Sequence, residues 1–136
     1  MDKLYFELVT PDRIVEKCHI EELIAPGVEG ELGILCNHAP LLTALTMGEL
    51  TYRHDNMYDY AMVEYGFLEV IDNNIIILAE NAELGKNINL ASALEEKKKA
   101  EEHLDYVRKK DSRMIEEAEI RLKRELLRVK VAERYR

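Results

Sequence analysis

Cysteine is scarce in this 136-residue chain, and long hydrophobic runs are missing from it. Cys18 and Cys36 show no C-x-x-C or Cys/His spacing, so they support neither a metal site nor a disulfide scaffold, and we expect two reduced core residues. No apolar stretch approaches the roughly 20 residues that cross a bilayer, and the start MDKLYFEL lacks the pattern of a secretion signal. The sequence therefore predicts a soluble, unexported protein without a transmembrane segment, which reaches a membrane only through a partner.

Glycine and proline are absent from the last 50 residues. All six glycines and all three prolines precede residue 87, so the residues that favour turns end abruptly there. This break predicts two domains, residues 1–86 and residues 88–136.

Basic residues are rare in the first of these parts. Residues 1–86 contain 16 acidic and 5 basic side chains, whereas residues 87–136 contain 11 acidic and 14 basic side chains. An acidic first part repels phosphate backbones, and the second part mixes both signs at helical spacing. The charge pattern therefore argues against nucleic-acid binding.

The first part has the pattern of short strands broken by turn residues. Seven or more such strands predict a β-sandwich or barrel, and Asp72-Asn73-Asn74 predicts a tight turn that makes the last two strands antiparallel neighbours. The expected strands are LYFELV, CHIEELIA, ELGILC, ELTYRH, MYDYAMVE, GFLEVI and NIIILAE.

From Ile88 onward the apolar residues follow a helical period. Asn89 is an expected N-cap, and Asp111 or Ser112 can cap a second helix, so the pattern predicts an αα-hairpin. Each helix carries one narrow apolar stripe. The first stripe consists of Leu90, Ala93, Leu94, Ala100, Leu104 and Val107, and the second of Ile115, Ala118, Leu122, Leu126 and Val129.

Several sequence blocks resemble one family. They are EGELGI at residues 29–34, HAPLLTAL at 38–45, GFLEV at 66–70, ILAE at 77–80 with Ala82-Glu83, and KKAEEHL at 98–104. In this order, over nearly the whole chain, they resemble the epsilon subunit of bacterial F-type ATP synthases. The resemblance implies a flattened β-sandwich followed by two helices.

The resemblance also implies a function. It suggests a non-catalytic central-stalk subunit, without a cofactor, at the cytoplasmic face of the bacterial membrane. Residues 1–86 would join the γ subunit to the c-ring and couple the proton-driven ring to the catalytic head. Residues 88–136 would inhibit ATP hydrolysis. The residues implied in contact with the c-ring and γ are Glu29, Gly30, Glu31, Leu32, Gly33, His38, Leu42 and Thr43.

The resemblance also implies roles for the basic residues of the second part and for the segment at its start. When the hairpin extends, its basic side chains would face the catalytic α/β subunits. These side chains are Arg113, Arg121, Lys123, Arg124 and Arg128. Nucleotide-binding epsilon subunits carry Ile/Leu-Asp-x-x-Arg-Ala, but this chain has Ile88, Asn89, Ser92 and Ala93 at the matching positions, so its motif is degenerate.

Simpler interpretations remain open for each of these features. Glu29–Gly33 is compatible with an ordinary solvated turn, the basic residues with a solvated helix face, and His38 with a structural role in pinning Ala39-Pro40. No nucleophile is patterned near His38, so we expect no catalytic residue and no metal site. Two other functions also remain, a nucleotide-sensing module that closes over ATP and a generic β-sandwich adaptor.

Overall fold

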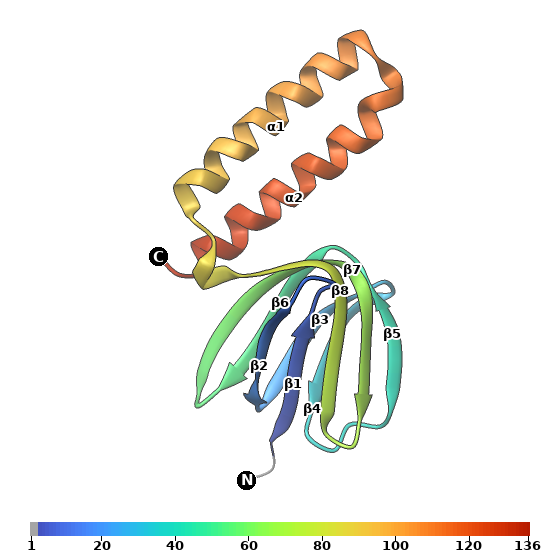
Figure 1. The fold of residues 1–136 in the computed structure, drawn as a ribbon, viewed down its shortest axis with the longest axis vertical. Coiled ribbons are helices and arrows are strands. Elements are labelled where there is room, and N and C mark those ends of the chain that lie inside the picture. Colours follow the sequence, from blue (N-terminus) through green and yellow to red (C-terminus); the bar gives the residue numbers. More distant parts are fainter. Residues whose placement is uncertain (1–2) are drawn as a thin grey trace. The chain divides into compact units, whose positions relative to one another are not determined.

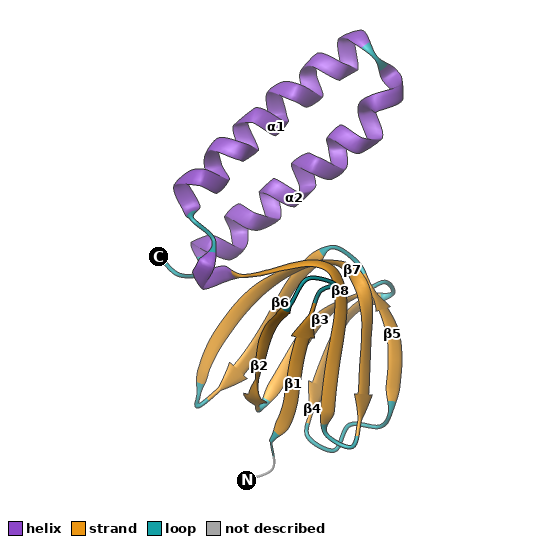
Figure 2. Cartoon of the chain, viewed as in Figure 1, coloured by secondary structure: helices purple, strands orange, loops and turns teal. Residues whose placement is uncertain are grey.

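Eight β-strands followed by two α-helices make up the computed structural model, which describes residues 3–136 (Figures 1 and 2). The predicted class, a β-sandwich followed by an αα-hairpin, is confirmed. The chain divides into two compact units, of which the first ends at Lys86 and the second begins at Asn87. The elements are β1 (Leu4–Val9), β2 (Ile14–Ile20), β3 (Glu22–Gly27), β4 (Gly30–Leu35), β5 (Leu41–Leu45), β6 (Gly48–His54), β7 (Met57–Ile71), β8 (Asn74–Leu84), α1 (Leu90–Lys110) and α2 (Ile115–Glu133).

The strands form one continuous, folded-over sheet in the order β2-β1-β8-β7-β5-β3-β4, and β6 pairs with β3 and β7. β1 runs parallel to β8, and the other pairs are antiparallel. The expected antiparallel pairing of the last two strands is confirmed, because Ile71 lies opposite Asn74 across the tight turn.

Alternation along the strands creates the core of the sandwich. In β1 the side chains of Leu4, Phe6 and Leu8 are fully buried, whereas the residues between them are only partly covered. Cys18 and Cys36 are half-buried and pack against this core, as the sequence predicted. The largest fully buried side chains of the core include Ile20, Leu23, Ile34, Leu50, Tyr52, Leu68, Ile75 and Ile77.

Several strands differ from those expected. MYDYAMVE and GFLEVI form the single strand β7, whose first part pairs with β6 and whose second part pairs with β5. CHIEELIA is divided between β2 and β3, because the chain bends at Glu21, whose N–H donates to the Arg53 carbonyl at 2.7 Å. LLTAL, which was not expected to be a strand, forms β5.

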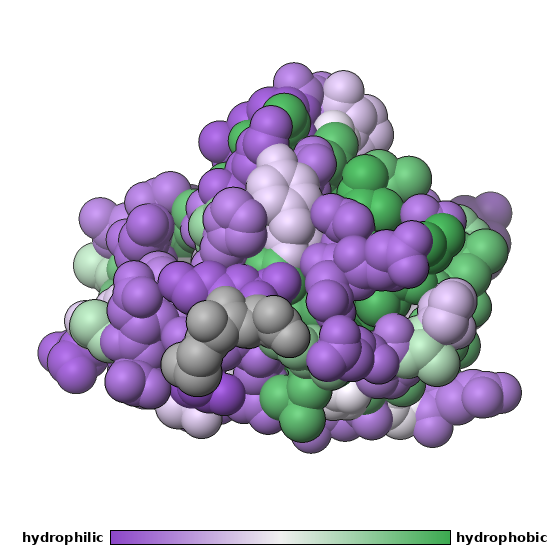
Figure 3. Space-filling model, turned by 90° about the horizontal axis from the view of Figure 1, so that it is seen from below, coloured by the Kyte–Doolittle hydropathy of each residue, from purple (hydrophilic) through white to green (hydrophobic). Residues whose placement is uncertain are grey.

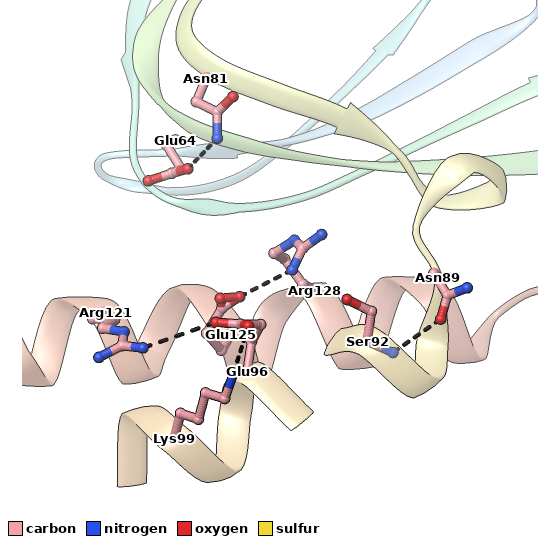
Figure 4. Close-up of polar contacts among 9 residues, drawn as sticks. All are labelled: Glu64, Asn81, Asn89, Ser92, Glu96, Lys99, Arg121, Glu125 and Arg128. Carbon is pink, nitrogen blue, oxygen red and sulfur yellow. Dashed lines mark hydrogen bonds and ion pairs between the residues drawn. The ribbon is translucent and has the colours of Figure 1, made fainter. Parts of the chain in front are cut away.

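The cap predicted for the first helix is confirmed, but the cap predicted for the second helix is not. Asp111 caps only the 3-10 turn Ser112–Met114, and α2 begins after Met114, which makes no side-chain capping bond. The Asn89 side-chain oxygen accepts a hydrogen bond from the Ser92 N–H at 2.9 Å (Figure 4), and Asp111 ends α1 while its carboxylate accepts from the Arg113 N–H at 3.1 Å. Leu104, Val107 and Ala118 pack between the helices.

Two leucines of the expected apolar stripes are not buried. Leu94 is 44% exposed and Leu126 is 47% exposed. Because an α-helix has 3.6 residues per turn, consecutive residues point in different directions. The residues just before these leucines, Ala93 and Glu125, are the ones that are buried. The carboxylate of Glu125 accepts from the Arg128 guanidinium at 3.1 Å, which explains how an acid is tolerated there.

Candidate functional site

The polar pairs inside the sandwich have the geometry of structural contacts. The Tyr52 hydroxyl donates to the Glu16 carboxylate at 3.0 Å, and the His54 Nε2 atom lies 2.5 Å from a carboxylate oxygen of Asp59.

Burial, reinforced by the negative charge of Glu16, raises the pKa of the Cys18 thiol to about 11. This thiol is therefore protonated at neutral pH and a poor nucleophile.

Within residues 3–136 no three His, Cys, Asp or Glu side chains lie close enough together to hold a metal ion. None of the described helices is long and apolar enough to span a membrane.

An apolar row runs across four strands on the outer surface of the sandwich. Strand register places Val9 beside Leu78, Leu78 beside Phe67, and Phe67 beside Ala44, all facing outward. Phe67 is 57% exposed and Leu78 is 52% exposed. This row forms the floor of an open groove of about 700 Å³, which also includes Thr10, Pro11, Leu45, Tyr65, Gly66, Ala79 and Glu80.

The groove exists because β7 bends without ending. Tyr65 adopts a left-handed conformation with φ of 48°, and Gly66 packs so closely on β8 that a Cβ atom would overlap the Leu78 carbonyl oxygen. Inside the bend, Glu64 is buried and accepts a hydrogen bond from the Asn81 side chain at 2.6 Å (Figure 4). The bend thus exposes Tyr65 and Phe67 on the same outer face.

The predicted contact loop, Glu29–Gly33, covers the β3–β4 turn and the start of β4. Gly30 has φ of 127°, which only glycine adopts easily. The Val28 N–H donates to the Ala44 carbonyl at 3.1 Å, so the turn adjoins the groove end of β5. Glu29, Glu31 and Gly33 are exposed, whereas Leu32 is half-buried.

Gly30 begins β4, and His38 lies beyond the opposite end of that strand. At 3.3 Å per residue, the strand separates the two by about 20 Å. The His38 Nδ1 atom lies 2.7 Å from the Ala39 carbonyl, in agreement with the expected pinning of the loop. Beside it, the Asn37 N–H donates to the Asn73 side chain at 2.6 Å. This end of the sandwich, seen in Figure 3, is mostly hydrophilic with separate hydrophobic patches.

Leu42 and Thr43 lie on β5, between the end of the sandwich with the β3–β4 turn and the end with His38. Leu42 faces outward and is 69% exposed, whereas Thr43 is half-buried opposite Leu68. The structure thus brings the β3–β4 turn close to the groove but does not gather the eight predicted contact residues into one cluster.

The basic residues of the hairpin are largely engaged within the hairpin itself. Arg121 on α2 reaches Glu96 on α1 at 3.8 Å, and Glu96 also lies 3.6 Å from Lys99 (Figure 4). Arg128 pairs with Glu125 at 3.1 Å, and Arg113 pairs with Asp111. Lys123 is exposed, and Arg124 is half-buried with polar contacts of its own. The folded hairpin therefore neutralises much of this basic face.

The degenerate nucleotide segment has a structural role in α1. Ile88 and Ala93 are buried, Asn89 caps the helix, and Ser92 contributes its N–H to that cap. Neither an acidic nor a guanidinium group is present at these positions.

Sequence reasoning missed the apolar groove. Alternation in GFLEVI placed Phe67 on one face of its strand, but only the pairing with β1, β5 and β8 places Leu78, Val9 and Ala44 beside it. Pairing between distant segments is not encoded in any single segment, so no local signal could have revealed this row.

Comparisons with known proteins all find the same protein family. Residues 3–85 match the family described as "ATP synthase, Delta/Epsilon chain, beta-sandwich domain". The chain is 42% identical to the ATP synthase epsilon chain of Syntrophomonas wolfei over 94% of this chain and 93% of the relative. It is 40% identical to the ATP synthase epsilon chain of Dehalococcoides mccartyi over 100% of this chain and 96% of the relative.

Solved structures with low sequence identity share the fold. A chain in the Euglena gracilis mitochondrial ATP synthase structure (OSCP/F1/c-ring) aligns with a TM-score of 0.76 and 19% identity, over 96% of this chain and 81% of that one. A chain from the central stalk and c-ring of the Tetrahymena thermophila enzyme aligns with a TM-score of 0.53 and 21% identity, over 65% of this chain and 71% of that one.

We predict that the chain binds ATP weakly, with a dissociation constant above roughly 10 μM. Ser92 cannot supply the charge-assisted bond of an arginine, which contributes about 1.5–3 kcal/mol. Arg121 and Arg128 would also have to leave Glu96 and Glu125 to bind phosphate. Calorimetric titration of the full chain with ATP measures the constant.

The variant with Asn89→Asp and Ser92→Arg should bind ATP more tightly without losing helix content, because Asp and Asn cap equally well. Ser92→Ala is the control and should leave binding unchanged. Tight binding by the unmodified chain would contradict this account of the degenerate segment.

Proposed function

Because this chain belongs to the ATP synthase epsilon chain family, we propose that it is a central-stalk subunit whose β-sandwich joins the γ subunit to the c-ring and whose helical hairpin restrains ATP hydrolysis. Epsilon chains are non-catalytic, and the catalytic sites of the enzyme lie in other subunits.

The single observation that carries the docking role is the exposed apolar groove. Phe67 and Leu78 each leave more than half of their surface in water, side by side in one row. Contiguous apolar surface of this kind marks a protein-interaction site, and aromatic anchors commonly dominate the binding energy. We assign this groove to the γ subunit, because γ is the partner against which a stalk subunit must transmit torque.

Phe67→Asp should weaken binding to the isolated γ subunit by about tenfold to a hundredfold, since an anchor of this type contributes about 2 kcal/mol or more. The fold should survive, because the side chain is already exposed. Tyr58→Asp is a matched control, since Tyr58 is an exposed aromatic residue of the same strand outside the groove. Equal binding by the Phe67 variant and the unmodified chain, measured by surface plasmon resonance, would exclude the groove as the γ site.

The β3–β4 turn is the proposed contact with the c-ring. Glu29 and Glu31 are exposed, and their carboxylates can accept charge-assisted hydrogen bonds from basic or amide groups of the ring's polar loops. Gly30 holds the turn in a shape that presents both acids. The turn adjoins the groove, so one end of the sandwich carries both proposed contacts.

The double variant Glu29→Arg with Glu31→Arg should reduce attachment of the catalytic head to membranes by about tenfold or more, because like-charge contacts across an interface cost several kcal/mol. The same charge reversal at Glu101 and Glu102, which are exposed on α1, is the control. Sedimentation of ATPase activity with the membranes measures attachment. Full attachment of the double variant would refute the loop assignment.

The hairpin suits a mobile inhibitory role because most buried side chains of its helices are small, being alanine or valine. Leu104, Val107 and Ala118 form one cluster with Ile115 and Leu122, and the exposed ion pairs contribute little each. If the hairpin opened, about 45 residues at 1.5 Å per residue would reach about 70 Å. Arg121, released from Glu96 of α1, would then be available to acidic segments of the catalytic subunits.

Deletion of residues 91–136 should raise ATP hydrolysis by the assembled enzyme while synthesis continues. The truncated chain should still fold, because all eight strands and the main core cluster lie upstream. Steady-state hydrolysis by the enzyme reconstituted with either form measures the effect. An unchanged rate under conditions that favour inhibition would show that the hairpin is not a brake.

A further inference from the structure

Tyr65 adopts a backbone conformation that its side chain disfavours. It has φ of 48° and lies inside the continuous strand β7. The other described non-glycine residues with positive φ are Asn or Asp in turns between strands, which tolerate this conformation: Asn37, Asp55, Asn56, Asp72 and Asn73. Strain of this kind is typical of sites where a side chain has a function. The backbone alone would favour Gly or Asn at position 65, so the reason for the tyrosine lies in what its ring contacts.

The Tyr65 side chain lies opposite a carboxylate at the edge of the apolar groove. Strand register pairs Gly66 of β7 with Ala79 of β8. One residue further along, Tyr65 and Glu80 lie opposite each other, and both line the groove. Both are exposed, and within residues 3–136 neither side chain forms a hydrogen bond or an ion pair. An aromatic ring and a carboxylate are therefore available to the same partner group.

Charge and polarity identify the group that fits between them. Among the described residues that line the groove, only Glu80 carries a charge, and the floor beside it is apolar. A carboxylate attracts a cation, and so does the face of a tyrosine ring. Lys and Arg carry their cation on an apolar stem, which can lie along an apolar floor. The site therefore matches a basic side chain and not an acidic or a purely apolar one.

We propose that Tyr65 and Glu80 together bind the cation of a lysine or arginine side chain of γ. The inference rests on the proposed assignment of the groove to γ, and it names the chemistry that fixes the γ segment in one register. Glu64 and Gly66, on either side of Tyr65, anchor the backbone on β8. The strained conformation is retained because it directs the ring toward the groove.

Three single variants separate the ring, the hydroxyl and the charge. Tyr65→Asn suits the left-handed backbone but removes the ring, so binding to the isolated γ subunit should weaken about tenfold or more while the melting temperature stays equal or rises. Tyr65→Phe keeps the ring face and should bind within about threefold of the unmodified chain. Glu80→Gln should weaken binding about tenfold and make the remaining binding less sensitive to salt. Glu101→Gln, an equal loss of charge on the exposed surface of α1, is the control and should change neither property.

The double variant Tyr65→Asn with Glu80→Gln tests whether the two groups bind the same cation. Its loss of affinity should be smaller than the product of the two single losses, because removing either group already weakens the hold on a shared cation. Surface plasmon resonance at low and high salt measures the affinities, and calorimetry measures the melting temperature. Single losses that simply multiply would show two independent contacts and would refute the shared site.

The outcomes separate this inference from the proposed function. If Phe67→Asp weakens binding while Tyr65→Asn and Glu80→Gln bind like the unmodified chain, the cation site is refuted and the groove remains the γ site. If all three variants bind like the unmodified chain, both are refuted. A fall in the melting temperature of Tyr65→Asn would refute the premise that the fold does not need the ring.

Discussion

The close contact between Gly66 and the Leu78 carbonyl is the constraint on which the rest of the sandwich depends. Because no side chain intervenes, β7 bends at Tyr65 and continues instead of ending. One strand can then pair with β6 along its first part and with β5 along its second part. The same bend exposes Phe67 beside Leu78, so the feature that closes the sandwich also creates its apolar groove.

The two units differ in what stabilises them. The sandwich is held by a continuous core of large buried side chains, whereas the buried side chains of the hairpin helices are mostly alanine and valine, and its ion pairs are mostly exposed. Exposed ion pairs contribute at most about 1 kcal/mol each, and salt screens them. Rigid docking is therefore expected of the sandwich, and a change of state is expected of the hairpin. This division agrees with the roles proposed for the two units.

Local patterns in the sequence were enough to predict the fold class, the break near residue 87, the hairpin turn at Asp72-Asn73-Asn74 and the Asn89 cap. Each of these depends on residues close together in the chain. The continuity of β7, the buried Glu125 and the row formed by Phe67 and Leu78 were not predicted, because they depend on pairing and packing between distant segments. Exposure of Leu94 and Leu126 was missed for the same reason, since the helical period alone does not say where a narrow stripe is centred.

The central claim is that the sandwich has two docking surfaces, the groove for γ and the β3–β4 turn for the ring. Hydroxyl-radical footprinting of the chain, free and within the membrane-bound enzyme, tests this claim most directly. Binding should protect Tyr65, Phe67 and Leu78, and should leave Tyr58 as reactive as in the free chain. Undiminished reactivity of Phe67 and Leu78 in the assembled enzyme would contradict the account.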